Sequence, residues 1–191
     1  YRRQRQMCIR DRSWTAIDQL QKAKETDTLD SYVDLRDIPS IIGGDSATRH
    51  GIVLAKSIPA KKYGISTAEP IASALKKCPS LVIASPDHHS YSAHSHALME
   101  FLSGYCPVIE QVSIDECYMD YTPICRDFES PQAAATIIKD SVRETFGFTV
   151  NVGISDRKVL AKMASDFKKP DLVHTLYAKE IQTKLLSLIH I

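Results

Sequence analysis

Apolar positions along the chain recur with two different periods, which separate predicted helices from predicted strands. Spacings of three and four residues predict helices over residues 14–24, 69–77, 87–105, 131–146 and 156–169. Short runs rich in Val and Ile have the length and composition of buried strands, and they lie at residues 38–42, 51–55, 81–83 and 147–154. With a strand pair over residues 108–122, the order from residue 81 onward fits a βαββαβ unit of the α+β class.

Residues that favour helix ends stand at several of the predicted boundaries. Pro59 suits the first turn of a short helix, and Gly64 suits the position just after its end. Asp87 precedes the third long helix, where a carboxylate complements the helix dipole. Ser155 is a suitable N-cap for the last helix, and Pro170 is a suitable stop. Local chemistry thus supports the bounds that the apolar period predicts.

The stretch 108–122 also holds two adjacent carboxylates, Asp115 and Glu116, between β-branched residues. Two such charges about 4 Å apart repel by roughly 4 kcal/mol at an effective dielectric near 20. A divalent cation with oxygen ligands reverses the sign of that interaction. The common alternative for an Asp-Glu pair is that one carboxylate points to solvent and the other caps a turn. The pair is therefore a candidate metal site. The flanking residues have to distinguish a metal site from a solvent-exposed and turn-capping pair.

Composition is that of an ordinary globular protein. The 191 residues allow one or two domains with a real core, and 43% of them are hydrophobic and 25% charged. No apolar run approaches the length of a membrane span, and no apolar signal region stands near the start. Neither a membrane partner nor secretion is therefore predicted.

The cysteines indicate the redox compartment, and the net charge bears on the kind of binding partner. Five cysteines, an odd number without a Cys-x-x-Cys pair, predict reduced thiols in a cytoplasmic protein. A net charge of +1 does not by itself indicate a nucleic-acid binder. Any DNA contact must then be local, or must lie in a part of the protein outside this chain.

Both ends of the chain differ from the rest. Residues 1–12 contain five arginines and no apolar period, and residues 185–191 form a short separate tail. Both resemble translated sequencing-adapter read-through, so we predict a foreign leader and a foreign tail. The alternative for the leader is a basic arm that binds nucleic acid.

Residues 113–120 read Ser-Ile-Asp-Glu-Cys-Tyr-Met-Asp. This run resembles the Ser-Ile-Asp-Glu-Ala-Tyr-Leu-Asp signature of Y-family translesion DNA polymerases, with substitutions only at Cys117 and Met119. The resemblance implies two catalytic Mg²⁺ ions bound through Asp115 and Glu116. Asp115 would bridge both ions, and Glu116 would hold the ion that activates the primer hydroxyl.

Residues 152–170 resemble a second signature of the same family, Val-Gly-Ile-Ser-x-Asn-Lys-x-Leu-Ala-Lys-x-Ala-Ser-Asp-x-x-Lys-Pro. The resemblance implies that Lys169, in the closing Lys-Pro, contacts the triphosphate of the incoming nucleotide. Lys158 and Lys162 are one helical turn apart and can share a face, so they are candidate DNA-binding residues. The alternative is a basic helix face that is merely solvated.

Residues 51–64 are similar to the nucleotide-holding segment of the family's fingers, but the match is incomplete. Lys61 stands where the family has Arg, which keeps the charge and loses bidentate geometry. Ala55 and Ile58 replace a Thr and a Tyr, whose hydrogen bonds their side chains cannot make. The variant is typical of DNA polymerase IV-like (DinB/UmuC-like) members, and Lys56 is a candidate to supply missing charge. The alternative is again a solvated helix face.

The resemblance covers most of residues 13–184 and implies a fold and a reaction. The fold is a small α/β fingers subdomain at 13–86 and a ferredoxin-like palm at 87–184, an antiparallel sheet with helices on one face. A strand near 81–84 lies at their boundary, and the thumb and little finger are absent. The reaction is error-prone, template-directed transfer of a deoxynucleotide to a primer 3′-hydroxyl by a two-metal mechanism.

The implied partners are primer-template DNA, deoxynucleoside triphosphates and, through the absent C-terminal part, the sliding clamp. Two alternatives remain open: a non-catalytic DNA- or partner-binding relative, and the catalytic subunit of a multi-subunit mutagenic polymerase. The family's third metal ligand lies on a first palm strand that residues 1–12 replace, and Asp11 is not its equivalent. We therefore expect the 191-residue chain alone to be inactive.

Replacing Lys56 tests its assignment to the nucleotide site. In an intact polymerase that contains this chain, Lys56→Ala is expected to raise the KM for the nucleotide severalfold, because a charge near the triphosphate is lost. Steady-state primer extension at varied nucleotide concentration measures the change. An unchanged KM would remove Lys56 from the site.

Overall fold

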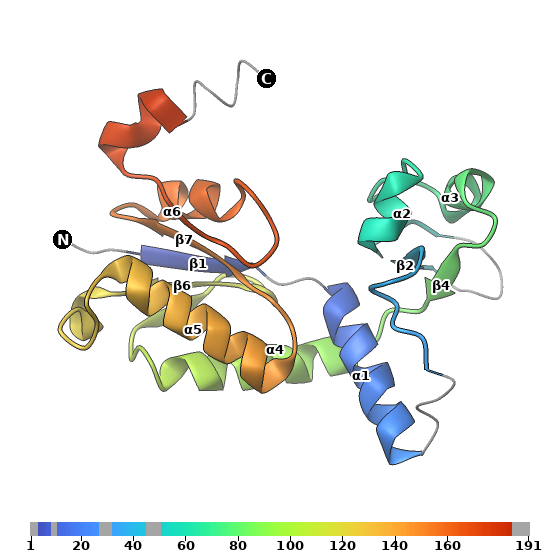
Figure 1. Ribbon diagram of the computed structural model, residues 1–191, viewed down its shortest axis with the longest axis horizontal. Helices are drawn as coiled ribbons and strands as arrows, with labels where there is room; N and C mark the ends of the chain where they lie inside the picture. The colour runs from blue at the N-terminus through green and yellow to red at the C-terminus, as the bar shows by residue number, and fades with distance from the viewer. Residues whose placement is uncertain (1–3, 9–10, 27–31, 45–50, 185–191) are drawn as a thin grey trace. The chain divides into compact units, whose positions relative to one another are not determined.

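The computed structural model describes residues 4–8, 11–26, 32–44 and 51–184 of the chain (Figure 1). The chain divides into two compact units, one formed by Tyr1–Ile9 with His94–Ile191 and the other by Arg10–Ala93. We call them the five-stranded unit and the three-stranded unit after their sheets. Each is described by itself.

The five-stranded unit is a mixed sheet with helices between its strands. In chain order its elements are β1 (Gln4–Cys8), α4 (His88–Ser103, whose first residues belong to the other unit), β5 (Ile109–Gln111), β6 (Glu116–Asp120), η2 (Thr122–Ile124), α5 (Pro131–Phe146), β7 (Asn151–Ser155), α6 (Lys158–Ser165), β8 (Val173–Thr175) and η3 (Ala178–Glu180). The strand order is β5-β6-β1-β7-β8. Without β8, this is the order of a ferredoxin-like βαββαβ sheet.

Strand β1 lies in the segment that was expected to replace the first palm strand. Residues 4–8 form the central strand and pair antiparallel with both β6 and β7, so the expectation of a missing strand is wrong, while the foreign origin of residues 1–12 stays a prediction. Cys8 stands opposite Glu116 on one side and opposite Asn151 on the other. Sheet pairing uses backbone groups, so a segment without an apolar run can still fill the central place. The first strand of the sheet is therefore present in this chain.

Helices cover both faces of this sheet, not one face as expected. Figure 1 shows α4 and α5 on one side of the strands and α6 on the other. Along β6 the burial alternates, with Cys117 and Met119 fully buried and Glu116, Tyr118 and Asp120 only partly buried. Because successive side chains of a strand point to opposite faces, Glu116 and Tyr118 share the face on which α6 lies.

Helix α6 approaches the sheet so closely that only glycine fits beneath it. A Cβ atom on Gly153 of β7 would lie 1.9 Å from the carbonyl oxygen of Ala161 and 2.5 Å from the amide nitrogen of Ser165. The helix backbone therefore rests directly on the strand. This contact fixes the height of α6 above the sheet.

The predicted helix start at Asp87 is confirmed, the cap of α5 was not predicted, and the predicted cap of α6 is wrong. Asp87 accepts a hydrogen bond from the amide of Ser90 at 3.0 Å, at the start of α4. Ser130 caps α5 by accepting from the amide of Ala133 at 3.1 Å. Ser155 is instead the last residue of β7, because the strand continues past Gly153, and α6 starts at Lys158 and ends well before Pro170.

The three-stranded unit holds α1 (Asp11–Glu25), β2 (Ser40–Ile42), β3 (Ala55–Lys56), α2 (Ile58–Lys62), α3 (Ile71–Lys77) and β4 (Val82–Ala84). Its sheet has the order β3-β2-β4, with β4 parallel to β2. The strand expected at the palm boundary therefore belongs to this unit. Its register with β2 places Ile41 opposite Ile83, 42 positions later in the sequence, which a local pattern does not show.

Two local predictions in this unit have different outcomes. The short helix α2 carries Pro59 in its first turn, and Gly64 follows it with a φ of 71°, as predicted. Residues 51–55 are not the buried strand expected, since Val53 is fully buried while Ile52 and Leu54 are 47% and 40% exposed. The chain instead makes a single bridge at Ile52 and enters β3 only at Ala55.

Ser57 ties α2 to the sheet. Its buried hydroxyl accepts hydrogen bonds from the amides of Ser40 and Ala60, both at 3.0 Å, and donates to the carbonyl of Ile38 at 2.7 Å. Beneath it, Ile41, Val53 and Ala60 belong to one buried cluster. The position of the segment that carries Lys56 and Lys61 is thereby set by one hydroxyl and a small apolar core.

None of the helices in the described ranges is long and apolar enough to cross a membrane.

Gly153→Ala tests the close contact of α6 with β7. The added methyl group would overlap the backbone of Ala161, so the variant is expected to lose about 3 kcal/mol or more of its free energy of unfolding. Thermal or urea unfolding followed by circular dichroism measures the loss. Gly104→Ala is the control, because its nearest neighbour would be 3.3 Å away, and equal stability of the two variants would contradict the contact.

Candidate active site

The two adjacent carboxylates lie where the β5–β6 hairpin turns, not in the middle of a strand. Asp115 is the last turn residue, and Glu116 is the first residue of β6. The amides of Val112 and Ser113 donate to the carbonyl of Glu116 at 2.9 and 3.2 Å and close the turn. The hydroxyl of Ser113 donates to Oδ1 of Asp115 at 2.7 Å. The turn thus presents both carboxylates at the end of the sheet, without burying their charges in the core.

Glu116 is paired with a lysine from the helix above it. Nζ of Lys162 lies 2.8 Å from Oε1 and 2.7 Å from Oε2 of Glu116, so the ammonium contacts both carboxylate oxygens. The glutamate side chain is 18% exposed and the lysine side chain 47%. This hydrogen bond outweighs partial burial of the ammonium and raises the pKa of Lys162 above its ordinary value of 10.5. A positive charge is therefore stabilised beside Glu116.

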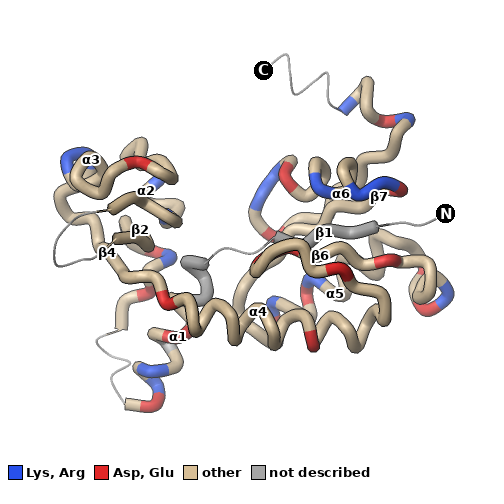
Figure 2. The backbone as a smooth tube through the Cα atoms, turned by 180° about the vertical axis from the view of Figure 1, so that it is seen from behind, with Lys and Arg blue, Asp and Glu red and all other residues tan. Residues whose placement is uncertain are grey.

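Lys158, one turn earlier on α6, pairs with the neighbouring strand. Its Nζ forms an ion pair with Glu110 of β5 and lies 5.5 Å from the centroid of the Tyr118 ring. Partial burial is the main cause that raises the pKa of Tyr118. The two lysines predicted to share a helix face do so, and in this structure both face carboxylates of the hairpin. Figure 2 shows the basic positions along α6.

Beneath this surface, the side of β6 that faces α4 and α5 is apolar. Cys117 is fully buried, and its burial raises the pKa of the thiol to about 12. The thiol therefore stays protonated and acts as a small core residue. The substitution of Ala by Cys at this position of the signature leaves the packing apolar.

Lys169 lies in the segment between α6 and β8. Its Nζ forms an ion pair with Asp166 at 2.7 Å, and its side chain is 24% exposed. Asn151, buried in β7, holds this segment by donating to the carbonyls of Ser165 and Lys168 at 3.1 and 2.8 Å. The residue expected to bind a triphosphate thus stands on a segment that the sheet itself anchors.

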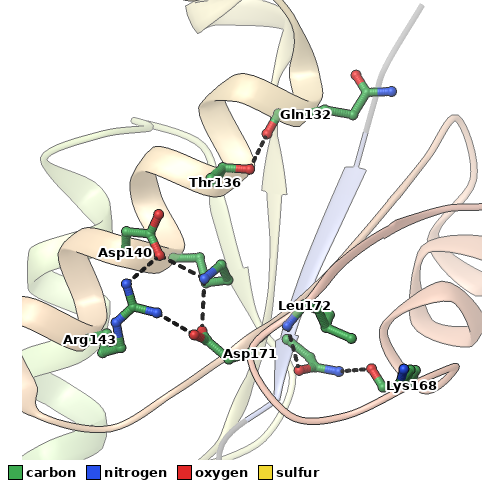
Figure 3. A network of polar contacts seen from close by, with 9 residues as sticks. Gln132, Thr136, Asp140, Arg143, Lys168, Asp171 and Leu172 are labelled. Atoms are coloured by element: carbon green, nitrogen blue, oxygen red, sulfur yellow. Dashed lines mark hydrogen bonds and ion pairs between the residues drawn. The ribbon is translucent and has the colours of Figure 1, made fainter.

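A charged network on α5, which was not predicted from the sequence, holds the segment between α6 and β8 (Figure 3). Asp171 accepts from Lys139 at 2.9 Å and pairs with Arg143, while Asp140 accepts from Lys139 at 2.7 Å. Burial tends to lower the pKa of Lys139, but its two carboxylate partners outweigh that effect and raise it. The only sequence signal was a lysine on the apolar side of a helix, which by itself points to no partner.

The remaining nucleotide-site candidates belong to the three-stranded unit. Lys56 ends β3, and Lys61 lies exposed in the last turn of α2. Ile58 is 53% exposed. The structure therefore brings Asp115, Glu116, Lys158 and Lys162 into one area of the five-stranded unit, while Lys56 and Lys61 belong to the three-stranded unit.

The chemistry of the carboxylate pair fits a hard divalent cation. Asp115 and Glu116 offer carboxylate oxygens, the ligands that Mg²⁺ prefers. The ammonium of Lys162 already lies against both oxygens of Glu116, which shows that this position favours positive charge. Within the described residues, no group of three or more His, Cys, Asp or Glu side chains comes together, so the pair accounts for only part of a ligand set.

Comparison with known families identifies the chain. A family model described as "impB/mucB/samB family" matches residues 25–166. The chain belongs to the impB/mucB/samB family. That match includes the hairpin with Asp115 and Glu116 and the whole of α6, so the carboxylate pair and the lysines above it lie inside the family's own region.

Curated relatives of this impB/mucB/samB-family chain are named DNA polymerase IV. The protein of Clostridium acetobutylicum is 47% identical over 173 residues, which are 91% of this chain and 42% of that protein. The protein of Alkaliphilus oremlandii is 43% identical over 148 residues, which are 78% of this chain and 37% of that protein. The chain therefore spans less than half the length of these relatives.

Solved structures support the same assignment. The structure described as DinB from Sulfolobus solfataricus has a TM-score of 0.76 at 25% identity, over 95% of this chain and 50% of that chain. A post-insertion binary complex of Dbh DNA polymerase has a TM-score of 0.76 at 26% identity, over 96% and 50% of the two chains. The α+β fold and the Y-family resemblance predicted from the sequence are confirmed.

Glu116→Gln tests the pairing with Lys162. Because the hydrogen bond to Glu116 is the main cause of the raised pKa, its loss is expected to lower the pKa of Lys162. In the wild type the pair contributes to the free energy of unfolding below about pH 10.5. This contribution is lost as the pH rises through the raised pKa of Lys162. NMR titration of the lysine Cε resonances measures the shift. Glu144→Gln, on α5, should leave it unchanged, and equal Lys162 pKa values in the wild type and the Glu116 variant would contradict the pairing.

Proposed function

We propose that this chain is the palm and fingers part of an error-prone, Y-family translesion DNA polymerase. The whole polymerase would add deoxynucleotides to a primer 3′-hydroxyl on a DNA template during DNA damage tolerance. The observation that carries the proposal is the Ser-Ile-Asp-Glu turn, which holds two carboxylates at the end of a ferredoxin-like sheet opposite a lysine-bearing helix. Relatives named DNA polymerase IV support it.

Asp115 and Glu116 would hold the catalytic Mg²⁺ ions in this proposal. When bound, two such ions stabilise the attacking and leaving oxygens of the phosphoryl transfer. The chain's own contribution is to orient both carboxylates. Ser113 orients Asp115, and Lys162 orients Glu116.

The lysines would bind the polyanionic substrates. Lys61, Lys169 and Lys56 would neutralise the triphosphate of the incoming nucleotide, a positioning and electrostatic role. Lys158 and Lys162 would contact primer-template DNA. Each of the last two already has a carboxylate partner, so DNA phosphates would have to replace Glu110 and Glu116. DNA affinity should then fall as salt rises.

A cytoplasmic setting and the sliding clamp complete the proposal. Within the described residues Cys78, Cys106, Cys117 and Cys125 form no disulfide, which suits a reducing compartment. The sliding clamp would be bound by a part of the polymerase outside this chain.

Glu116→Gln in a polymerase that contains this chain tests the function. It removes one negative charge from the proposed metal site, so primer extension with Mg²⁺ is expected to fall at least about 100-fold, while affinity for primer-template DNA is retained. In the 191-residue chain the same variant is expected to weaken Mn²⁺ binding at least about tenfold, measured by electron paramagnetic resonance of free Mn²⁺.

Glu129→Gln is the matched control, because Glu129 is an exposed carboxylate in the loop before α5. It should change neither extension nor Mn²⁺ binding. Extension that survives Glu116→Gln would argue for a non-catalytic or differently built site. Loss of DNA affinity together with extension would mean that Glu116 supports the fold and not the chemistry.

A further inference from the structure

The segment between α6 and β8 is fixed on both sides of Lys169. On one side, Nδ2 of Asn151 donates to the carbonyl of Lys168 at 2.8 Å. On the other, Oδ1 of Asn151 accepts from the amide of Leu172 at 3.2 Å. Asn151 is 3% exposed, so one buried amide side chain clamps the backbone before and after Lys169. Asn151 contacts only backbone groups here, so the side chain of Asp171 is held by other residues.

Helix α5 holds that side chain. Lys139 and Arg143, one turn apart, both pair with the carboxylate of Asp171 (Figure 3). The Lys139 side chain is only 8% exposed, and a buried ammonium is costly unless it is paired. Asp140 supplies its second partner at 2.7 Å. Two positive and two negative charges thus balance within one network that reaches from α5 to the segment of Lys169.

The backbone of Asp171 points to the same conclusion. Its φ is 60°, a left-handed conformation that Asp and Asn tolerate better than most residues. A strained or uncommon backbone persists only where the surroundings over-determine it. Here those surroundings are the Asn151 clamp and the two cations of α5. The network therefore determines the path of the chain two residues after Lys169.

A fixed backbone helps to orient the ammonium of Lys169, because the lysine side chain itself is flexible. A lysine carries a point charge on four rotatable bonds, and its useful orientation depends on where its backbone stands. Anchoring that backbone lowers the entropy lost when the ammonium binds an anion. In this structure Nζ of Lys169 pairs with Asp166 at 2.7 Å.

We propose that Asp171, held by Lys139 and Arg143, is a positioning residue for Lys169 at the triphosphate of the incoming nucleotide. The proposal rests on the proposed function, which assigns Lys169 to that triphosphate. Asp171 does not touch the nucleotide. It acts by fixing the segment from which Lys169 reaches the phosphates.

A double-mutant cycle separates positioning from general stability. Wild type, Asp171→Asn, Lys169→Met and the double variant are titrated with Mg·dATP, and binding is measured by calorimetry on the 191-residue chain. Asn keeps the tolerance for positive φ and removes only the charge, so the backbone conformation stays accessible. Asp127→Asn, an exposed Asp→Asn change in the turn after η2, is the matched control.

Asp171→Asn is expected to weaken Mg·dATP binding about three- to tenfold, since misplacing a binding group by about 1 Å can cost up to roughly 100-fold. In the Lys169→Met background the same change should have no further effect, because the group that it positions is gone. Arg143→Gln, at a 45% exposed side chain, removes one of the two cations and should weaken binding in the same direction by less.

The outcomes distinguish this proposal from the proposed function. If the wild type binds no Mg·dATP, or Lys169→Met does not weaken binding, the nucleotide site itself is wrong and the positioning role falls with it. If Lys169→Met weakens binding while Asp171→Asn does not, only the positioning role is overturned. Equal factors for Asp171→Asn in both backgrounds, with a lowered Tm, would also overturn it by showing a purely structural role.

Discussion

The direct contact of helix α6 with strand β7 over Gly153 is the constraint on which the site depends. Since no side chain fits between them, the helix backbone lies against the sheet, and its lysines reach the neighbouring strands. Lys162 then meets Glu116, and Lys158 meets Glu110 and the Tyr118 ring. A larger residue at position 153 would lift the helix and separate these partners.

Each carboxylate of the hairpin turn has a donor partner within the chain. Ser113 donates to Asp115, and the ammonium of Lys162 neutralises Glu116. A site that binds divalent cations and DNA phosphates benefits from such internal partners, because they limit repulsion between adjacent carboxylates and can be exchanged. Under the proposed function, stability and binding would use the same groups, and neither role would require a charge in the apolar core.

The opposite side of the sheet contributes through a different network. Lys139, Arg143 and Asp171 connect α5 with the segment that follows α6, and Asn151 connects the same segment with β7. Elements far apart in the sequence thus fix one short segment. Buried charge pairs of this kind add little net stability and strongly penalise alternatives that leave one partner unpaired. The network is better suited to defining a geometry than to stabilising the fold.

The sequence by itself determined the local features and the family. The two signatures, the helix start at Asp87, and the turn at Pro59 and Gly64 depend on neighbouring residues, and the structure bears these local features out. Only the tertiary structure decided that residues 4–8 form the central strand, that residues 82–84 join the other sheet, and that Lys139 has Asp171 as its partner. Strand pairing and buried ion pairs join residues distant in sequence through backbone groups and geometry, which no local pattern encodes.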